Sequence, residues 1–138
     1  MPSKYIETAK GQKNKKITKK MKTLKEILLE NKEGATLDFD YRPQHFENGF
    51  AVSLTDNKII DWFNWSDEEI KKEAEKIKNL ASLLNIDKAF LGWWSDEEVG
   101  YLDLTLVIEN KEDALRLGKL FNQKAVYDFR TGKVIDIK

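Results

Sequence analysis

The chain has 138 residues, of which 41% are hydrophobic, 24 are basic and 24 are acidic, with one histidine and no cysteine. This length and composition predict one folded domain with a buried core and exclude a wholly disordered chain. The absence of cysteine excludes disulfides, thiol nucleophiles and cysteine-ligated zinc, and one histidine excludes sites built on several imidazoles. No stretch resembles a signal peptide or a membrane span, so we expect a cytoplasmic protein without a membrane partner.

The charges are distributed unevenly along the chain. Residues 1–22 contain eight lysines and one glutamate, a net charge of +7, and residues 23–138 therefore carry −7. Residues 1–20 also have too few apolar side chains to offset the entropy of ordering them. We expect them to form a flexible basic arm attached to a single α+β domain of residues 21–138. The arm lysines assigned to nucleic-acid binding, as an alternative function, are Lys13, Lys15, Lys16, Lys19 and Lys20.

The first helix has two candidate starts. Thr23 followed by Glu26 has the spacing of a capping box, which favours a helix that begins directly after Thr23. The alternative is a longer helix that reaches back into the arm, because Ile17, Met21 and Leu24 are also at helical spacing.

Two strands are expected next. Leu37, Phe39 and Tyr41 alternate with polar residues, which predicts a half-buried strand over residues 36–41. A second strand follows over residues 50–54, where Phe50 and Val52 alternate with small residues. Residues 42–49 between them are predicted to be a loop.

The strongest signal is a helix over residues 67–84. Ser66 and Glu69 have the spacing of a capping box, and Trp65 with Ile70 has that of a hydrophobic staple. One apolar stripe runs along this helix, formed by Ile70, Ala74, Ile77, Leu80, Ala81 and Leu84.

The C-terminal half is predicted to contain two hairpins around a short helix. The first hairpin joins residues 89–94 to 101–108, and the second joins 125–129 to 133–137 through a turn at Gly132. The helix follows Asn110 and should face inward with Ala114, Leu117, Gly118 and Phe121. The order α-ββ-α-ββ-α-ββ predicts an α+β fold, an antiparallel sheet of five to six strands with two to three helices on one face.

The sequence offers little support for catalysis. Asp38 and Asp40 would share a face of the first strand, and Asp61 and Asp103 also lie beside apolar runs, but the solvent face of a strand explains such acids better. His45 lies in a loop without a nucleophile motif, and no glycine-rich phosphate loop is present. We therefore expect no enzymatic activity, no cofactor and no metal site.

Several aromatic side chains sit close together in the sequence. Trp62, Phe63 and Trp65 form one group, and Trp93 with Trp94 forms another. Aromatic platforms stack nucleic-acid bases, but acids flank both groups and would repel a phosphate backbone. Core packing explains most of these residues, and only one side chain of the Trp93–Trp94 pair can face the core of a strand.

Element lengths bring two acidic segments to one end of the molecule. The long helix rises about 27 Å over 18 residues, and the strand after it returns over about 23 Å. The helix start and the hairpin turn should therefore lie together, an acidic end that we predict to bind a partner. Its six residues are Asp67, Glu68, Glu69, Asp96, Glu97 and Glu98. The alternative is that the acids at the helix start only complement the helix dipole and that those of the turn are only solvated.

Part of the chain resembles a known group of proteins. The motifs are LGWW at 91–94, GYLD at 100–103 and NQKAVYD at 122–128. They resemble a family of small uncharacterised proteins of phages and mobile elements with a GxW…YxD…NQxAIxD pattern, over about residues 88–138. The resemblance implies an accessory protein in a bacterial host, and the family does not carry the lysine-rich residues 1–20.

Two functions follow as hypotheses. The first is a protein that binds and inhibits or modulates a host protein through its acidic end. That host protein would be a nucleic-acid-handling effector, so the inhibitor would act against host defence in the manner of an anti-CRISPR protein. The second is a nucleic-acid-associated protein tethered by the basic arm.

Overall fold

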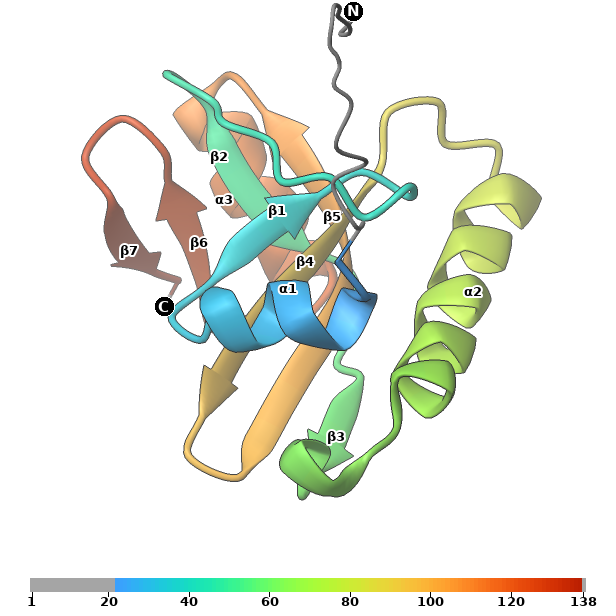
Figure 1. Cartoon of the computed structure of the whole chain (residues 1–138). Helices are drawn as coiled ribbons and strands as arrows, with labels where there is room; N and C mark the ends of the chain where they lie inside the picture. The colour runs from blue at the N-terminus through green and yellow to red at the C-terminus, as the bar shows by residue number, and fades with distance from the viewer. Residues whose placement is uncertain (1–21, 138) are drawn as a thin grey trace, which may run out of the picture.

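Over residues 22–137 the fold is α+β, with three α-helices and one antiparallel sheet of seven strands (Figure 1). A computed structural model describes residues 22–137, and the predicted arm with its lysines at positions 13–20 lies outside this range. The predicted fold class and the order of elements are confirmed, with one additional strand. The strands are β1 (Ala35–Leu37), β2 (Phe50–Ser53), β3 (Lys58–Ile60), β4 (Phe90–Asp96), β5 (Val99–Ile108), β6 (Ala125–Asp128) and β7 (Lys133–Asp136).

The long strand β5 organises the sheet. The strand order is β1-β4-β5-β2-β6-β7, and β3 pairs with β5 beyond the end of β2. Ser53 of β2 lies opposite Thr105, and Lys58 of β3 lies opposite Tyr101. One side of β5 therefore pairs with two short strands in succession. The four residues between them form a bulge, which stays hydrogen-bonded to β5 through the Leu54 N–H and the Asn57 carbonyl.

The helices begin where their caps predict. They are α1 (Leu24–Glu30), α2 (Asp67–Leu83) and α3 (Lys111–Leu120), and a short 3-10 helix, η1 (Trp62–Asn64), precedes α2. Complete capping boxes join Thr23 to Glu26 and Ser66 to Glu69, so α1 starts after Thr23 and the longer alternative is wrong. Within residues 22–137, no helix combines the length and apolar character that crossing a bilayer requires.

The core divides into two apolar clusters on one face of the sheet. The larger cluster packs α1 and α2 against β1, β4 and β5, with Leu28, Ile70 and Leu104 fully buried. The smaller cluster centres on Val52 beneath α3, which lies behind β2 in Figure 1. Because Val52 lies opposite Leu106, two residues from Leu104, both clusters share a face of the sheet, as predicted.

Two residues of the predicted apolar stripes are exposed instead of buried. Leu84 is 56% exposed and Phe121 is 45% exposed. Both are C-cap residues, each followed by an asparagine in the left-handed region, with φ 56° at Asn85 and 58° at Asn122. The chain therefore leaves the helical path at these positions, and Ile86 packs against the core in place of Leu84.

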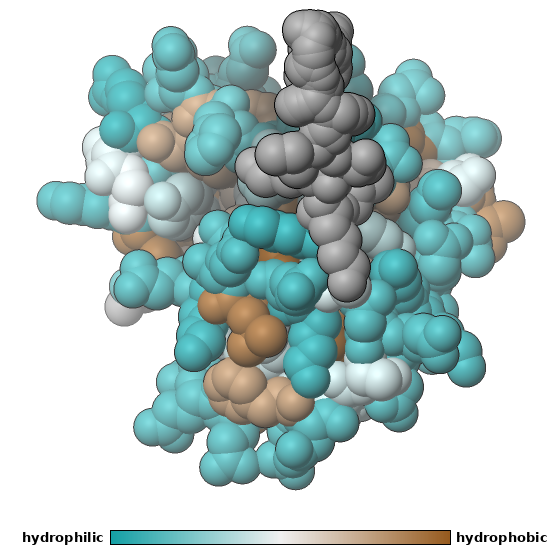
Figure 2. Space-filling view, in the orientation of Figure 1, coloured by the Kyte–Doolittle hydropathy of each residue, from teal (hydrophilic) through white to brown (hydrophobic). Residues whose placement is uncertain are grey.

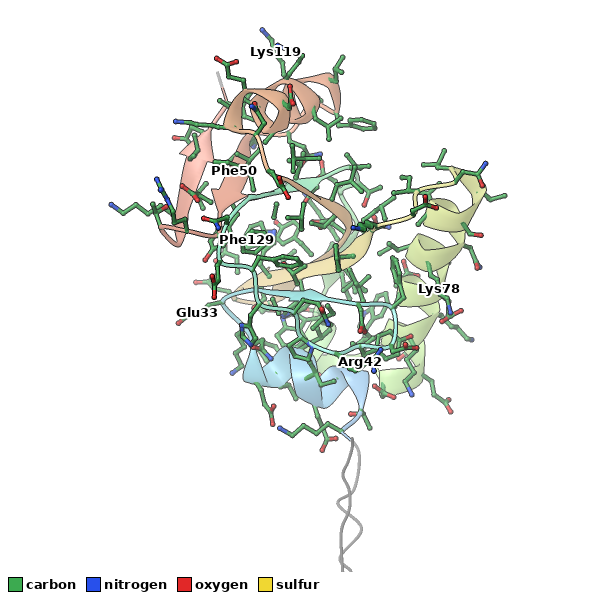
Figure 3. The ribbon with its side chains drawn as sticks, turned by 90° about the horizontal axis from the view of Figure 1, so that it is seen from above. Glu33, Arg42, Phe50, Lys78, Lys119 and Phe129 are labelled. Carbon is green, nitrogen blue, oxygen red and sulfur yellow. The ribbon has the colours of Figure 1, made fainter. Side chains whose placement is uncertain are left out.

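The strand predicted over residues 36–41 is shorter than expected. It ends at Leu37 because the Asp38 carboxylate accepts hydrogen bonds from the N–H groups of Asp40 and Arg42, both at 2.9 Å, and closes a turn. Arg42 Nε also pairs with the Asp38 carboxylate at 2.9 Å. Figure 3 shows Arg42 near α2. Partial burial opposes ionisation of Asp38, but these hydrogen bonds outweigh it and hold its pKa below the ordinary value. The expectation that Asp38 and Asp40 share a strand face is therefore wrong.

Candidate functional site: the acidic end

The turn between β4 and β5 presents three of the predicted acidic residues. The hairpin closes at Glu97, whose φ of 55° lies in the left-handed region, and the side chains of Asp96, Glu97 and Glu98 are exposed. The N–H and indole N–H of Trp62 donate to the carbonyls of Glu98 and Glu97, at 3.3 and 3.4 Å. The buried Trp62 therefore fixes the backbone of this turn and leaves its carboxylates in solvent.

The other side of the turn is also anchored. The backbone N–H and the hydroxyl of Ser95 both donate to the Lys32 carbonyl, at 3.0 and 2.9 Å. Asp61, in the left-handed region just before η1, adds a further carboxylate next to Glu98. The hydrogen bond between the two carboxyl groups and the charge of Asp61 raise the pKa of Glu98 above its ordinary value.

The start of α2 uses two of its three acids for structure. Asp67 accepts a hydrogen bond from the Lys25 N–H at 2.9 Å and pairs with Lys71 at 3.2 Å. Glu69 accepts from the Ser66 N–H at 2.8 Å, and its hydrogen bonds with Ser66 lower the pKa of Glu69. Glu68 is exposed. These side chains stabilise the helix start, and only Glu68 has no such structural role in the described part of the chain.

The two acidic segments lie at the same end of the molecule but do not form one continuous cluster. Figure 1 places the β4–β5 turn and the start of α2 at the lower end, with η1 between them. Two lysines contact Phe63 of η1. On the side of α2, Lys25 Nζ donates to the Phe63 carbonyl at 2.7 Å, and on the side of the turn, Lys32 Nζ lies 5.5 Å from the centre of the Phe63 ring. The acidic end is therefore divided by an aromatic side chain and two lysines.

A shallow groove of about 440 Å³ lies between η1 and the turn. Its apolar part is the ring of Phe63, which is 42% exposed and stacks on the buried Trp62 with ring centroids 4.3 Å apart. Apolar side chains are visible below α1 in Figure 2, above the hydrophilic lower rim of the molecule. The residues that line the groove are Lys32, Glu33, Phe63, Ser95, Glu97 and Glu98.

The four tryptophans have mostly structural positions, as predicted. Trp62 and Trp93 are buried in the larger cluster with their rings 4.9 Å apart, and Trp65 packs against that cluster. Trp94 faces the opposite side of the sheet, 45% exposed, and stacks on Tyr101 at 4.2 Å. One tryptophan of the Trp93–Trp94 pair faces the core and the other does not, as strand alternation requires.

A buried carboxyl group is the main finding that the sequence did not predict. Asp103 was expected on a solvent face, but it is only 4% exposed. Its Oδ1 accepts the Asn57 N–H at 3.1 Å, from the bulge between β2 and β3. Burial, together with the charge of Asp56, raises the pKa of Asp103 to about 7, against the lowering effect of hydrogen bonds from Asn57 and Ser53.

Other candidates for chemistry stay apart from one another. His45 is exposed in the loop before β2, and Asp38 and Asp40 are held in their own turn by Arg42. Among residues 22–137, no group of three or more His, Asp or Glu side chains is arranged to hold a metal ion. The lysines at positions 13–20 lie outside the described residues.

No protein-family model, no curated protein and no solved structure matches this chain.

Proposed function

We propose that this protein binds a basic surface of a partner protein through the β4–β5 turn of its acidic end, and that it acts by occupancy without catalysis. One observation carries the proposal. Within residues 22–137, no lysine or arginine forms an ion pair with Asp96, Glu97 or Glu98, although their backbone is anchored on two sides. Exposed carboxylates on a fixed turn lose little conformational freedom when they meet a partner, which favours binding.

The charge balance supports a partner of opposite charge. Residues 23–138 carry −7, so long-range attraction would speed their encounter with a basic surface and oppose contact with nucleic acid. A basic groove that normally holds nucleic acid is the kind of surface that fits. The resemblance to phage and mobile-element proteins adds the context, which is inhibition or modulation of a host protein in the bacterial cytoplasm.

The test compares what three forms of the full chain capture from a lysate of the bacterial host, before and after nuclease treatment. The forms are the wild type, the turn variant D96K/E97K/E98K, and a control variant E47K/D87K/E109K. The control changes the net charge equally, at exposed acids in loops at the other end of the molecule (Figure 1).

The proposal predicts a protein that the wild type and the control variant capture, that the turn variant loses, and that nuclease does not release. Nuclease-sensitive capture that the turn variant retains would overturn the proposal. It would instead support the alternative, in which the basic arm tethers the protein to nucleic acid.

A further inference from the structure

The groove beside Phe63 combines an apolar surface with an excess of negative charge. Phe63 stacks on Trp62, which is fully buried, so its ring is held in place and one face is presented to the groove. The Lys32 ammonium lies 5.5 Å from the centre of this ring, so the aromatic face already attracts a cation. Lys32 is the only basic side chain among the six residues that line the groove, against Glu33, Glu97 and Glu98.

Further charge gathers at the rim. The carboxyl groups of Asp61 and Glu98 lie next to each other at the edge of the groove, where mutual repulsion opposes the ionisation of both. An incoming cation would relieve this repulsion. The groove therefore fits a segment that carries an apolar side chain flanked by lysines.

A segment of this kind directly precedes the described residues, and α1, which follows it, ends two residues before the groove-lining Lys32. Residues 13–20 read KNKKITKK, with Ile17 between two pairs of lysines. Residue 22 is the first residue that the structure describes, and three residues later Lys25 donates to the Phe63 carbonyl at 2.7 Å. Ile17 lies five positions before Lys22, and an extended chain of five steps spans about 17 Å, which exceeds the length of about 10 Å of α1. Ile17 is therefore within reach of the ring of Phe63.

We propose that residues 13–20 of the chain's own N-terminal segment occupy this groove, with Ile17 against Phe63 and the neighbouring lysines paired with Glu33, Glu97 and Glu98. The attachment is intramolecular, so its effective concentration is in the millimolar range even though each exposed ion pair is weak. The segment would then compete with the partner for the same carboxylates, a regulatory role that rests on the proposed function. Binding of the segment itself does not depend on it.

The test uses the absence of cysteine from the chain. The variant Q12C of the full chain carries one nitroxide spin label, and the loss of backbone amide signals is measured by NMR at low salt and at about 0.5 M NaCl, where the Debye length is about 4 Å. We expect the amides of Phe63, Ser95 and Glu97 to lose most of their intensity at low salt and to recover it at high salt. Substitution E97Q/E98Q should restore these signals, while the amide of Asp67, whose carboxylate accepts the Lys25 N–H at 2.9 Å, should change little.

Two controls decide between occupants. In the variant with Lys15, Lys16, Lys19 and Lys20 replaced by Gln, the groove signals should stay intact at low salt. The second control mixes spin-labelled chain at natural isotopic abundance with ¹⁵N-enriched chain that carries no spin label, and the groove signals should also stay intact there. Intact signals in the labelled wild type at low salt, or losses that E97Q/E98Q leaves unchanged, would overturn the proposal. Losses in the mixture would assign the groove to the segment of a second copy and would also overturn it. No partner is present in this experiment, so its failure leaves the capture experiment unaffected.

Discussion

Asp103 makes the stability of this protein depend on pH near neutrality. Its carboxyl group has a pKa of about 7 in the folded state, against an ordinary value of 3.8, because it is buried beneath the bulge between β2 and β3. Between these two pH values the folded state binds more protons than the unfolded state. The stabilisation is fully present below pH 3.8 and is lost as the pH rises through about 7.

The size of the effect follows from the shift. One pKa unit corresponds to 1.36 kcal/mol, and two pH units separate pH 5 from the folded-state pKa of about 7. Raising the pH from 5 to 8 should therefore lower the free energy of unfolding by about 3 kcal/mol. The substitution Asp103→Asn removes the titrating proton and keeps an oxygen that accepts the Asn57 N–H. The variant should therefore be more stable than the wild type at pH 8, with a smaller difference at pH 5.

Urea unfolding at pH 5, 6, 7 and 8 measures this difference, and subtracting the two curves cancels the titration of groups that they share. Asp56→Asn is the matched comparison, because Asp56 is exposed and its charge contributes to the raised pKa. It should reduce the pH dependence without abolishing it. Parallel curves for the wild type and Asp103→Asn over this range would refute the reasoning.

Three further substitutions test the fold. Ser66→Ala should lower the free energy of unfolding by about 1 kcal/mol, since it removes the N-cap of α2, and Trp65→Ala should cost more because a large aromatic side chain leaves the edge of the core. Urea midpoints equal to that of the wild type would contradict both. Gly100→Ala would place a methyl group against the rings of Trp93 and Trp62 in a packed region, so we expect a loss of about 1–3 kcal/mol in the same assay. An unchanged midpoint would show that the contact is not tight.

The parts of the fold that the sequence predicted are those with local causes. The starts of α1 and α2 depend on residues three positions apart, and the opposite directions of Trp93 and Trp94 follow from strand alternation alone. The predicted strand over residues 36–41 failed for a local reason as well. Apolar and polar residues do alternate there, but the Asp38 carboxylate accepts hydrogen bonds from the Asp40 and Arg42 N–H groups and closes a turn instead.

What the sequence could not predict depends on contacts between distant segments. β3 has three residues and exists because it pairs with β5 some forty positions later. Asp103 is buried because the bulge around Asn57 covers it, on the face of the sheet opposite to the helices. On that same face Phe46 packs against Phe90 and Phe129, the second of which is labelled in Figure 3. Alternation identifies this face but does not indicate what lies over it.

The acidic end shows the same division. Helix and strand lengths place the start of α2 and the β4–β5 turn at one end of the molecule, as Figure 1 shows. They do not reveal that Asp67 and Glu69 are engaged in hydrogen bonds, or that Phe63 and Lys32 separate the two segments. These details shift the proposed binding residues toward Asp96, Glu97 and Glu98.

The central claim is that these carboxylates attract a basic partner, and the association rate of the captured partner tests it most directly. The rate constant is measured against ionic strength for the wild type, for D96K/E97K/E98K and for the control E47K/D87K/E109K. Folding should differ little among them, since exposed charges contribute little to stability. We predict a rate that falls steeply with salt for the wild type and the control, and a slower, less salt-dependent rate for the turn variant. Equal rates and equal salt slopes for the wild type and the turn variant would contradict the claim.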